Sequence, residues 1–124
     1  MKILFEHQHL YYHPQFEPII QELQRRDVEG IYGSLSETVP ELEKKLFKKE
    51  MARLGVELVG ANFEPQRRRI IKDMNFDLIF VGNKTSLAAI KANNSFSVMI
   101  YHGIGLKQSN YTDLTTDLDL VCVE

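Results

Sequence analysis

The 124-residue sequence lacks several features that mark whole classes of protein. It has one cysteine, Cys122, which excludes an internal disulfide framework, and the apolar run around Cys122 predicts a reduced thiol in the core. No apolar stretch approaches the roughly 20 residues that cross a bilayer, and the N-terminus is typical of a strand rather than of a signal peptide. The formal net charge of −2 gives no general attraction to nucleic acid. We therefore expect a cytoplasmic protein that binds anions, if at all, through local charges.

Two phosphate-binding motifs are also missing. A dinucleotide-binding domain needs a G-x-G-x-x-G turn after its first strand, and that position holds His7-Gln8-His9-Leu10-Tyr11-Tyr12-His13 instead. The stretch Gly82-Asn83-Lys84-Thr85-Ser86 fails the spacing of a P-loop. Three histidines within seven residues raise the alternative of a metal site, but no cysteine or carboxylate in that loop supports it. We expect no cofactor and no metal.

The sequence does contain short apolar runs that alternate with segments of helical spacing, which predicts βαβ units and a parallel sheet. We expect strands near residues 2–6, 29–33, 56–60, 77–81, 97–101 and 118–123. The run Leu78-Ile79-Phe80-Val81 is apolar throughout, as in a central strand covered on both faces. The prediction is one α/β domain over residues 1–124, with a Rossmann-like, mostly parallel sheet of about six strands in the order 3-2-1-4-5-6 and helices on both faces. The last strand lacks a following segment to cover it, so we expect the natural polypeptide to continue.

Four helices are expected between these strands. The first has Pro14 and Pro18 in its opening turn; the second starts with the capping-box spacing of Thr38-Val39-Pro40-Glu41 and ends at Gly55. The third lies near residues 65–74 and the fourth near 84–92. The positions expected to face the core are Phe16, Ile19, Ile20 and Leu23, then Val39, Leu42, Leu46 and Leu54, then Ile70, Ile71 and Met74, and finally Leu87, Ala88 and Ile90.

An arginine run, Arg67-Arg68-Arg69, is expected around the outside of the third helix. Such a run is typical of a solvated helix face. The alternative is docking on anionic lipid headgroups, which would place the protein at the inner face of the membrane.

Candidate site residues follow the expected strands, because open α/β sheets bind ligands at strand carboxyl ends. After the fifth strand come His102, a candidate acid or base, Gly103 and Gly105, whose amides can approach a phosphate, and Lys107, which can hold one. The structural alternatives are a histidine bonded to a carbonyl at a tight turn and a solvated loop lysine. His7 and His9 after the first strand, and Asn83 and Lys84 after the fourth, are expected to line the substrate cleft. The pattern at Asn83 favours a plain helix cap over a ligand-binding residue.

The run Tyr101-His102-Gly103-Ile104-Gly105-Leu106-Lys107 resembles the H-G-x-x-x-K segment of the CDP-glycerol glycerophosphotransferase family, the teichoic-acid-type polymerases and primases. Phe5-Glu6-His7 before a tyrosine-rich loop, and the stretch from Pro14 to Ile20, also resemble the N-terminal half of that family. The resemblance covers essentially the whole chain. It implies a GT-B architecture in which this chain is the acceptor-side domain and a C-terminal domain, absent from the sequence, binds the CDP of the donor.

On this resemblance, His102 corresponds to the base that takes the proton from the acceptor hydroxyl, whose oxygen attacks the phosphorus bearing glycerol and expels CMP. The implied partners are a CDP-activated donor and a polymer or glycan acceptor, and the isolated chain is expected to be inactive. Positioning and charge stabilisation by the glycine amides and Lys107 suit such phosphoryl transfer. Two alternatives are a sugar-nucleotide glycosyltransferase of the same architecture and a non-catalytic α/β binding module.

Overall fold

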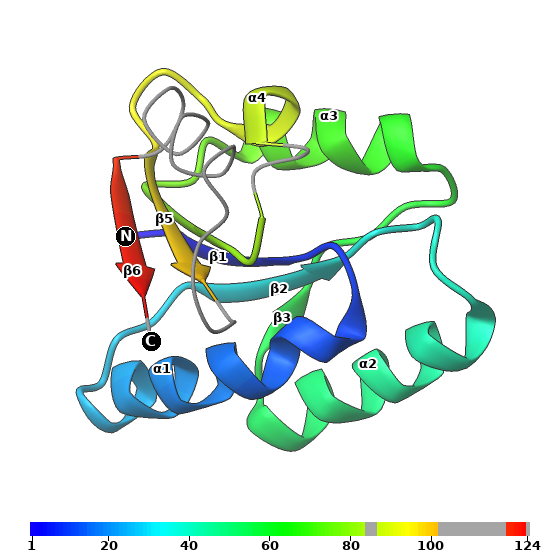
Figure 1. Ribbon diagram of the computed structural model, residues 1–124, viewed down its shortest axis with the longest axis horizontal. Coiled ribbons are helices and arrows are strands. Elements are labelled where there is room, and N and C mark those ends of the chain that lie inside the picture. Colours follow the sequence, from blue (N-terminus) through cyan, green and yellow to red (C-terminus); the bar gives the residue numbers. More distant parts are fainter. Residues whose placement is uncertain (84–86, 102–118, 124) are drawn as a thin grey trace.

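The computed structural model describes residues 1–83, 87–101 and 119–123 (Figure 1). They form a parallel sheet in the order β3-β2-β1-β4-β5-β6. The strands are β1 (Ile3–His7), β2 (Ile31–Leu35), β3 (Glu57–Leu58), β4 (Leu78–Val81), β5 (Phe96–Tyr101) and β6 (Leu120–Val123). Five of them have four to six residues, and β3 has two. The predicted α/β class, the Rossmann-like parallel sheet and the strand order are confirmed.

Helices cover both faces of the sheet (Figure 1). One face carries α1 (His13–Arg25) and α2 (Glu41–Leu54), and the other carries α3 (Glu64–Met74) and α4 (Leu87–Ile90); a short 3₁₀ helix, η1 (Leu10–Tyr12), precedes α1. Because side chains alternate along a strand, neighbouring residues of β1 enter different cores. Phe5 packs with the α1 and α2 side chains, and Leu4 packs with the α3 and α4 side chains. No helix in the described part of the chain is long and apolar enough to cross a membrane.

The helix ends follow local sequence. Gly55 has φ 70° and ends α2, as predicted, because glycine adopts this left-handed conformation without steric cost. Asn75 ends α3 in the same way, at φ 59°. Pro14 lies in the first turn of α1, but Pro18 lies inside the helix rather than in the opening turn. Pro18 has no N–H to donate to the carbonyl one turn earlier, which leaves one helical hydrogen bond unmade.

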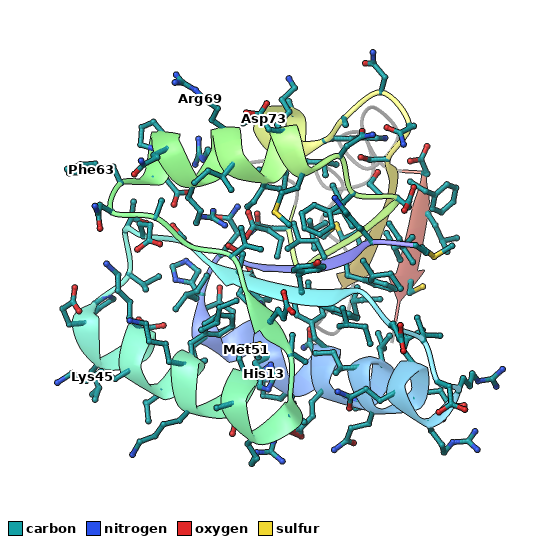
Figure 2. All side chains as sticks on the ribbon, turned by 180° about the vertical axis from the view of Figure 1, so that it is seen from behind. His13, Lys45, Met51, Phe63, Arg69 and Asp73 are labelled. Carbon is teal, nitrogen blue, oxygen red and sulfur yellow. The ribbon has the colours of Figure 1, made fainter. Side chains whose placement is uncertain are left out.

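The buried face of α2 differs from the prediction. Leu42 and Leu46 are 68% and 43% exposed, whereas Phe47 and Met51 are buried against the sheet. Figure 2 shows Met51 on the side of α2 that faces the sheet and Lys45 on the outer side. Both pairs have the i, i+4 spacing of a helical stripe, so the period alone did not distinguish them. The expected capping box is also wrong, because Pro40 is the N-cap and makes no side-chain cap hydrogen bond.

The prediction for the cysteine is wrong, because it lies exposed in the edge strand β6. Cys122 was expected in the core, but it is exposed. Its neighbour Leu120 is 49% exposed. An edge strand has a partner on one side only, here β5, so an apolar run does not ensure burial.

Candidate functional site at the carboxyl edge of the sheet

The strand order reverses between β1 and β4, and ligands of open α/β sheets bind outside the strand carboxyl ends at such a switch point. The segment after β1 passes through η1 into α1, and Gly82-Asn83 follows β4. These two segments meet. The Tyr12 ring lies so close to Gly82 that a Cβ there would overlap it, which explains the glycine at this position.

Four side chains form a cluster at this point, which we call the crevice cluster: His9, Tyr11, Tyr12 and Asn83. The Nδ2 of Asn83 donates a hydrogen bond of 2.8 Å to the Tyr12 hydroxyl, and the Tyr11 hydroxyl donates to the same oxygen at 3.3 Å. The His9 and Tyr11 rings stack, with centroids 5.1 Å apart and planes 10° from parallel. Tyr11 and His9 are exposed while Tyr12 is buried, so the cluster presents polar aromatic groups to solvent and is anchored by a buried ring.

Tyr12 is held as a neutral phenol. Burial raises its pKa to about 12, although the hydrogen bond from Asn83 opposes the shift. The crevice cluster therefore offers hydroxyl, amide and imidazole groups, which suit hydrogen bonding to the hydroxyl or phosphate oxygens of a ligand.

His7 lies beneath the crevice cluster and does not reach the surface. It was expected to line the substrate cleft, but its ring is fully buried. Its Nδ1 lies 3.0 Å from the Phe5 carbonyl oxygen and 3.2 Å from that of Ser34, and its Nε2 lies 3.2 Å from Nδ1 of His13. Burial, together with the smaller effect of the nearby His13, lowers the pKa of His7 to about 3. His7 is thus a neutral, internal hydrogen-bonding residue in this structure.

A buried ion-pair network lies under the same edge, around Arg67. Both terminal nitrogens of Arg67 donate to the Glu6 carboxylate, at 2.7 and 3.1 Å, and neither side chain is exposed. Arg67 also donates to Ser34 Oγ at 2.9 Å and to both oxygens of Glu64 at 2.9 and 2.7 Å. The prediction that Arg67 lies on the outside of its helix is therefore wrong. Arg69 is exposed, as expected.

The network links α3 to the loop after β2. Glu64 accepts a hydrogen bond from the Glu37 amide, and Glu37 accepts one from the Ala61 amide. Burial alone would raise the pKa of Glu64, but hydrogen bonds from Arg67, from the Glu37 amide and from Arg68 lower it to about 2. An ionised Glu64 and the buried Glu6–Arg67 pair thus hold β1, the loop after β2 and α3 together.

A cavity of about 300 Å³ opens between α2 and the ends of β2 and β3. Its walls include Leu35, Phe47 and Val59, with Lys44 and Lys48 among the polar residues. Lys44 Nζ lies 3.4 Å from a Glu37 oxygen, so part of the positive charge is already compensated.

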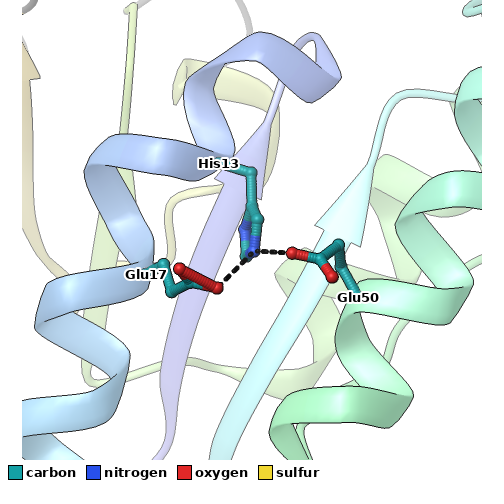
Figure 3. Close-up of side chains that lie close together, drawn as sticks. All are labelled: His13, Glu17 and Glu50. Carbon is teal, nitrogen blue, oxygen red and sulfur yellow. Dashed lines mark ion pairs between the residues drawn. The ribbon is translucent and has the colours of Figure 1, made fainter.

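The described residues contain one group of three side chains with the geometry of metal ligands: His13 and Glu17 from α1 and Glu50 from α2 (Figure 3). The Nε2 of His13 lies 3.4 Å from Glu50 Oε1 and 3.9 Å from Glu17 Oε1. From the sequence, His13 was one of three histidines in the loop after the first strand, and its carboxylate neighbours were not predicted. Only the H-x-x-x-E spacing of His13 and Glu17 gave a signal for part of this group.

The structure brings some of the predicted site residues together. His9 and Asn83 join the same cluster through Tyr11 and Tyr12. The remaining predicted residues lie outside the described part of the chain: His102, Gly103, Gly105, Lys107 and Lys84.

The arrangement at the carboxyl edge can bind a polar ligand, since it combines exposed hydrogen-bonding groups with buried residues that hold them in place. The described residues include carboxylates and imidazoles, but the candidate base His102 is not among them. Comparisons with protein-family models, curated proteins and solved structures find no match, so the function has to be argued from these residues and their geometry.

Proposed function

We propose that the chain is the acceptor-side domain of a CDP-glycerol glycerophosphotransferase-like enzyme with a GT-B architecture. In this proposal the enzyme moves glycerol phosphate, or a related alditol phosphate, from a CDP-activated donor to a hydroxyl of a polymer or glycan. The donor is bound by a second domain, and His102 takes the proton from the acceptor hydroxyl.

The observation that carries the proposal is the position of β5 in the parallel sheet. β5 lies next to β4, which lies next to β1. Parallel strands end at the same edge, so β5 ends at the edge where the crevice cluster lies. In the sequence, β5 is followed directly by His102-Gly103 and, four residues later, by Lys107. The motif that resembles the transferase family thus follows a strand of the edge where Rossmann-like sheets bind ligands.

The crevice cluster supports an acceptor rather than a nucleotide on this domain. Its exposed groups are the Tyr11 ring and hydroxyl and the His9 imidazole, which suit hydrogen bonds to hydroxyl and phosphate oxygens. The segment after β1 lacks the glycine-rich turn that would cradle a pyrophosphate.

The first experiment tests acceptor binding by the isolated chain. We expect poly(glycerol phosphate) to shift the backbone amide resonances of His9, Tyr11 and Asn83 in ¹H–¹⁵N NMR spectra. Tyr11→Ala should weaken this binding, whereas Phe63→Ala, which removes an exposed aromatic ring that follows β3, should not. Shifts that avoid the crevice cluster would contradict the assignment of the acceptor site.

The second experiment tests the transfer itself. The protein that contains this chain together with a donor domain is expected to release CMP from CDP-glycerol when a hydroxyl-bearing acceptor is present. The isolated chain should release none. Transfer by the isolated chain would contradict the proposal that the donor is bound by a second domain. Release of a nucleoside diphosphate from a sugar nucleotide would favour the glycosyltransferase alternative.

A further inference from the structure

The hydrogen-bond pattern of two buried histidines determines which ring nitrogens carry hydrogen. Nδ1 of His7 faces the carbonyl oxygens of Phe5 and Ser34, at 3.0 and 3.2 Å, and a carbonyl oxygen can only accept. His7 Nδ1 therefore carries the hydrogen, and in a neutral ring its Nε2 is an acceptor. The partner of that Nε2 is His13 Nδ1 at 3.2 Å, so His13 Nδ1 is the donor.

Because Nδ1 of His13 carries the hydrogen, Nε2 of the neutral ring is unprotonated and has a lone pair. His13 is only 5% exposed, and its Nε2 has no hydrogen-bond partner within the described residues. The atom points at two carboxylates, those of Glu50 and Glu17 (Figure 3). A lone pair directed at two anionic oxygens is unfavourable unless a cation lies between them.

We propose that His13, Glu17 and Glu50 bind a divalent transition-metal ion, with Zn²⁺ as the best fit. An imidazole nitrogen with two carboxylate oxygens is a donor set that Zn²⁺ accepts. The candidate ligand atoms lie within 4.8 Å of one another. Tetrahedral Zn²⁺ with bonds of about 2.0–2.2 Å separates its ligand atoms by about 3.3 Å, so His13 and Glu50 are already close to the required spacing and Glu17 has to move inward.

The surroundings of these three residues fit a metal site in two further ways. Metal-binding histidines usually donate their other ring N–H to an acceptor that fixes the ring, and His7 is that acceptor for His13. The site also has an entry path, because His13 and Glu50 line a groove of about 600 Å³ between the start of α1 and α2. A coordination position that the protein leaves open would face this groove.

Arg53 is the competing cation. It donates to both oxygens of Glu50, at 2.8 and 2.9 Å, and it pairs with Glu17. Its side chain is 51% exposed, so the guanidinium can withdraw into solvent when a metal ion binds. Removing Arg53 should therefore strengthen metal binding, whereas a purely structural ion-pair cluster would bind no metal with or without it. This inference does not depend on the proposed transferase function.

The test is calorimetric titration of the chain with Zn²⁺, in a Cys122→Ser background because an exposed thiol also binds zinc. We expect one saturable site. Glu50→Gln and His13→Gln should each weaken binding by about 100-fold or more, and Arg53→Gln should tighten it by about tenfold. Glu22→Gln is the matched control, because Glu22 is another α1 carboxylate paired with arginines and should leave binding unchanged.

Co²⁺ gives an independent readout, since a site with one nitrogen and two oxygen ligands produces visible absorption that the Glu50→Gln variant should lose. If His13→Gln fails to fold, the partly exposed Glu17 and Glu50 decide the question through their glutamine variants. The proposal is overturned if no saturable binding occurs up to about 1 mM Zn²⁺. It is equally overturned if the Glu17→Gln and Glu50→Gln variants bind Zn²⁺ as well as the wild-type chain.

Discussion

The buried pair of Glu6 and Arg67 allows a quantitative prediction. Arg67→Met keeps a long apolar side chain at this position of α3 but removes the guanidinium. Glu6 is fully buried and loses both hydrogen bonds from Arg67, and Ser34 and Glu64 lose theirs as well. The variant therefore leaves the buried Glu6 carboxylate without the guanidinium that it pairs with in the native chain.

Breaking a buried pair by removing one partner costs about 3–5 kcal/mol, a large part of the roughly 5–15 kcal/mol that stabilises a typical domain. The thermal midpoint should fall by roughly 10–20 °C. Replacing both partners is different, because neither charge of the Glu6–Arg67 pair remains, and Glu64 keeps its ion pair with Arg68. Glu6→Leu combined with Arg67→Met should recover most of the lost stability, so the two substitutions should be strongly non-additive.

The assay is urea denaturation followed by far-UV circular dichroism on the two single variants and the double variant. Arg69→Met is the matched control, because Arg69 is an exposed arginine of the same helix. Its free energy of unfolding should lie within about 0.5 kcal/mol of the wild-type value. If Arg67→Met were as mild as Arg69→Met, the buried ion pair would not exist in solution and the reasoning would be refuted.

Three further predictions concern other parts of the edge. The pKa of Glu64 is about 2 in the folded chain and near 4.5 when unperturbed. The contribution of the ionised Glu64 to the free energy of unfolding is thus complete above pH 4.5 and is lost as the pH falls toward 2. The urea midpoint should therefore fall over this pH range, and Glu64→Gln should make the midpoint less dependent on pH. Gly82→Ala should cost about 1–3 kcal/mol in urea denaturation because of overlap with the Tyr12 ring, whereas Gly60→Ala should cost less. If the proposed transferase function holds, His102→Asn in the longer enzyme should lower kcat by about 10²-fold or more, measured as CMP release; a near-normal kcat would assign the proton to another group.

Much of the fold could be predicted from the sequence because its signals are local. The apolar run of β4, from Leu78 to Val81, and the alternation of such runs with helical spacing indicated a parallel sheet covered on both faces. Gly55 marked the end of α2 correctly. The strand β2 was expected at 29–33 and lies at Ile31–Leu35, because its ladder with β1 continues through Gly33 and Ser34, where the apolar pattern is interrupted.

The candidate site could be predicted only in part. The rule that ligands bind at strand carboxyl ends selected His9 and Asn83, and the structure brings both into the crevice cluster, while their role in binding stays a prediction. The same rule placed His7 at that edge but did not predict that its side chain is buried. His7 is the last residue of β1, and its side chain points into the layer between the sheet and the helices, where Phe16 and Phe47 cover it. The position of a strand end does not determine which face the last side chain takes once the neighbouring helices pack.

The sequence by itself determined the order of strands and helices, and therefore the edge at which ligands can bind. Only the tertiary structure decided how the charged groups pair. Glu6 is 61 positions from Arg67, and His13 and Glu50 come from different helices. Two signals of buried charge are present in the sequence: a glutamate within the apolar run of β1, and an arginine four residues before Ile71 on the same helix face. Neither signal indicates which residue is the partner. Burial supplies the missing information, because a charge removed from water has to meet an opposite charge or a hydrogen-bond partner, and packing determines which one is within reach.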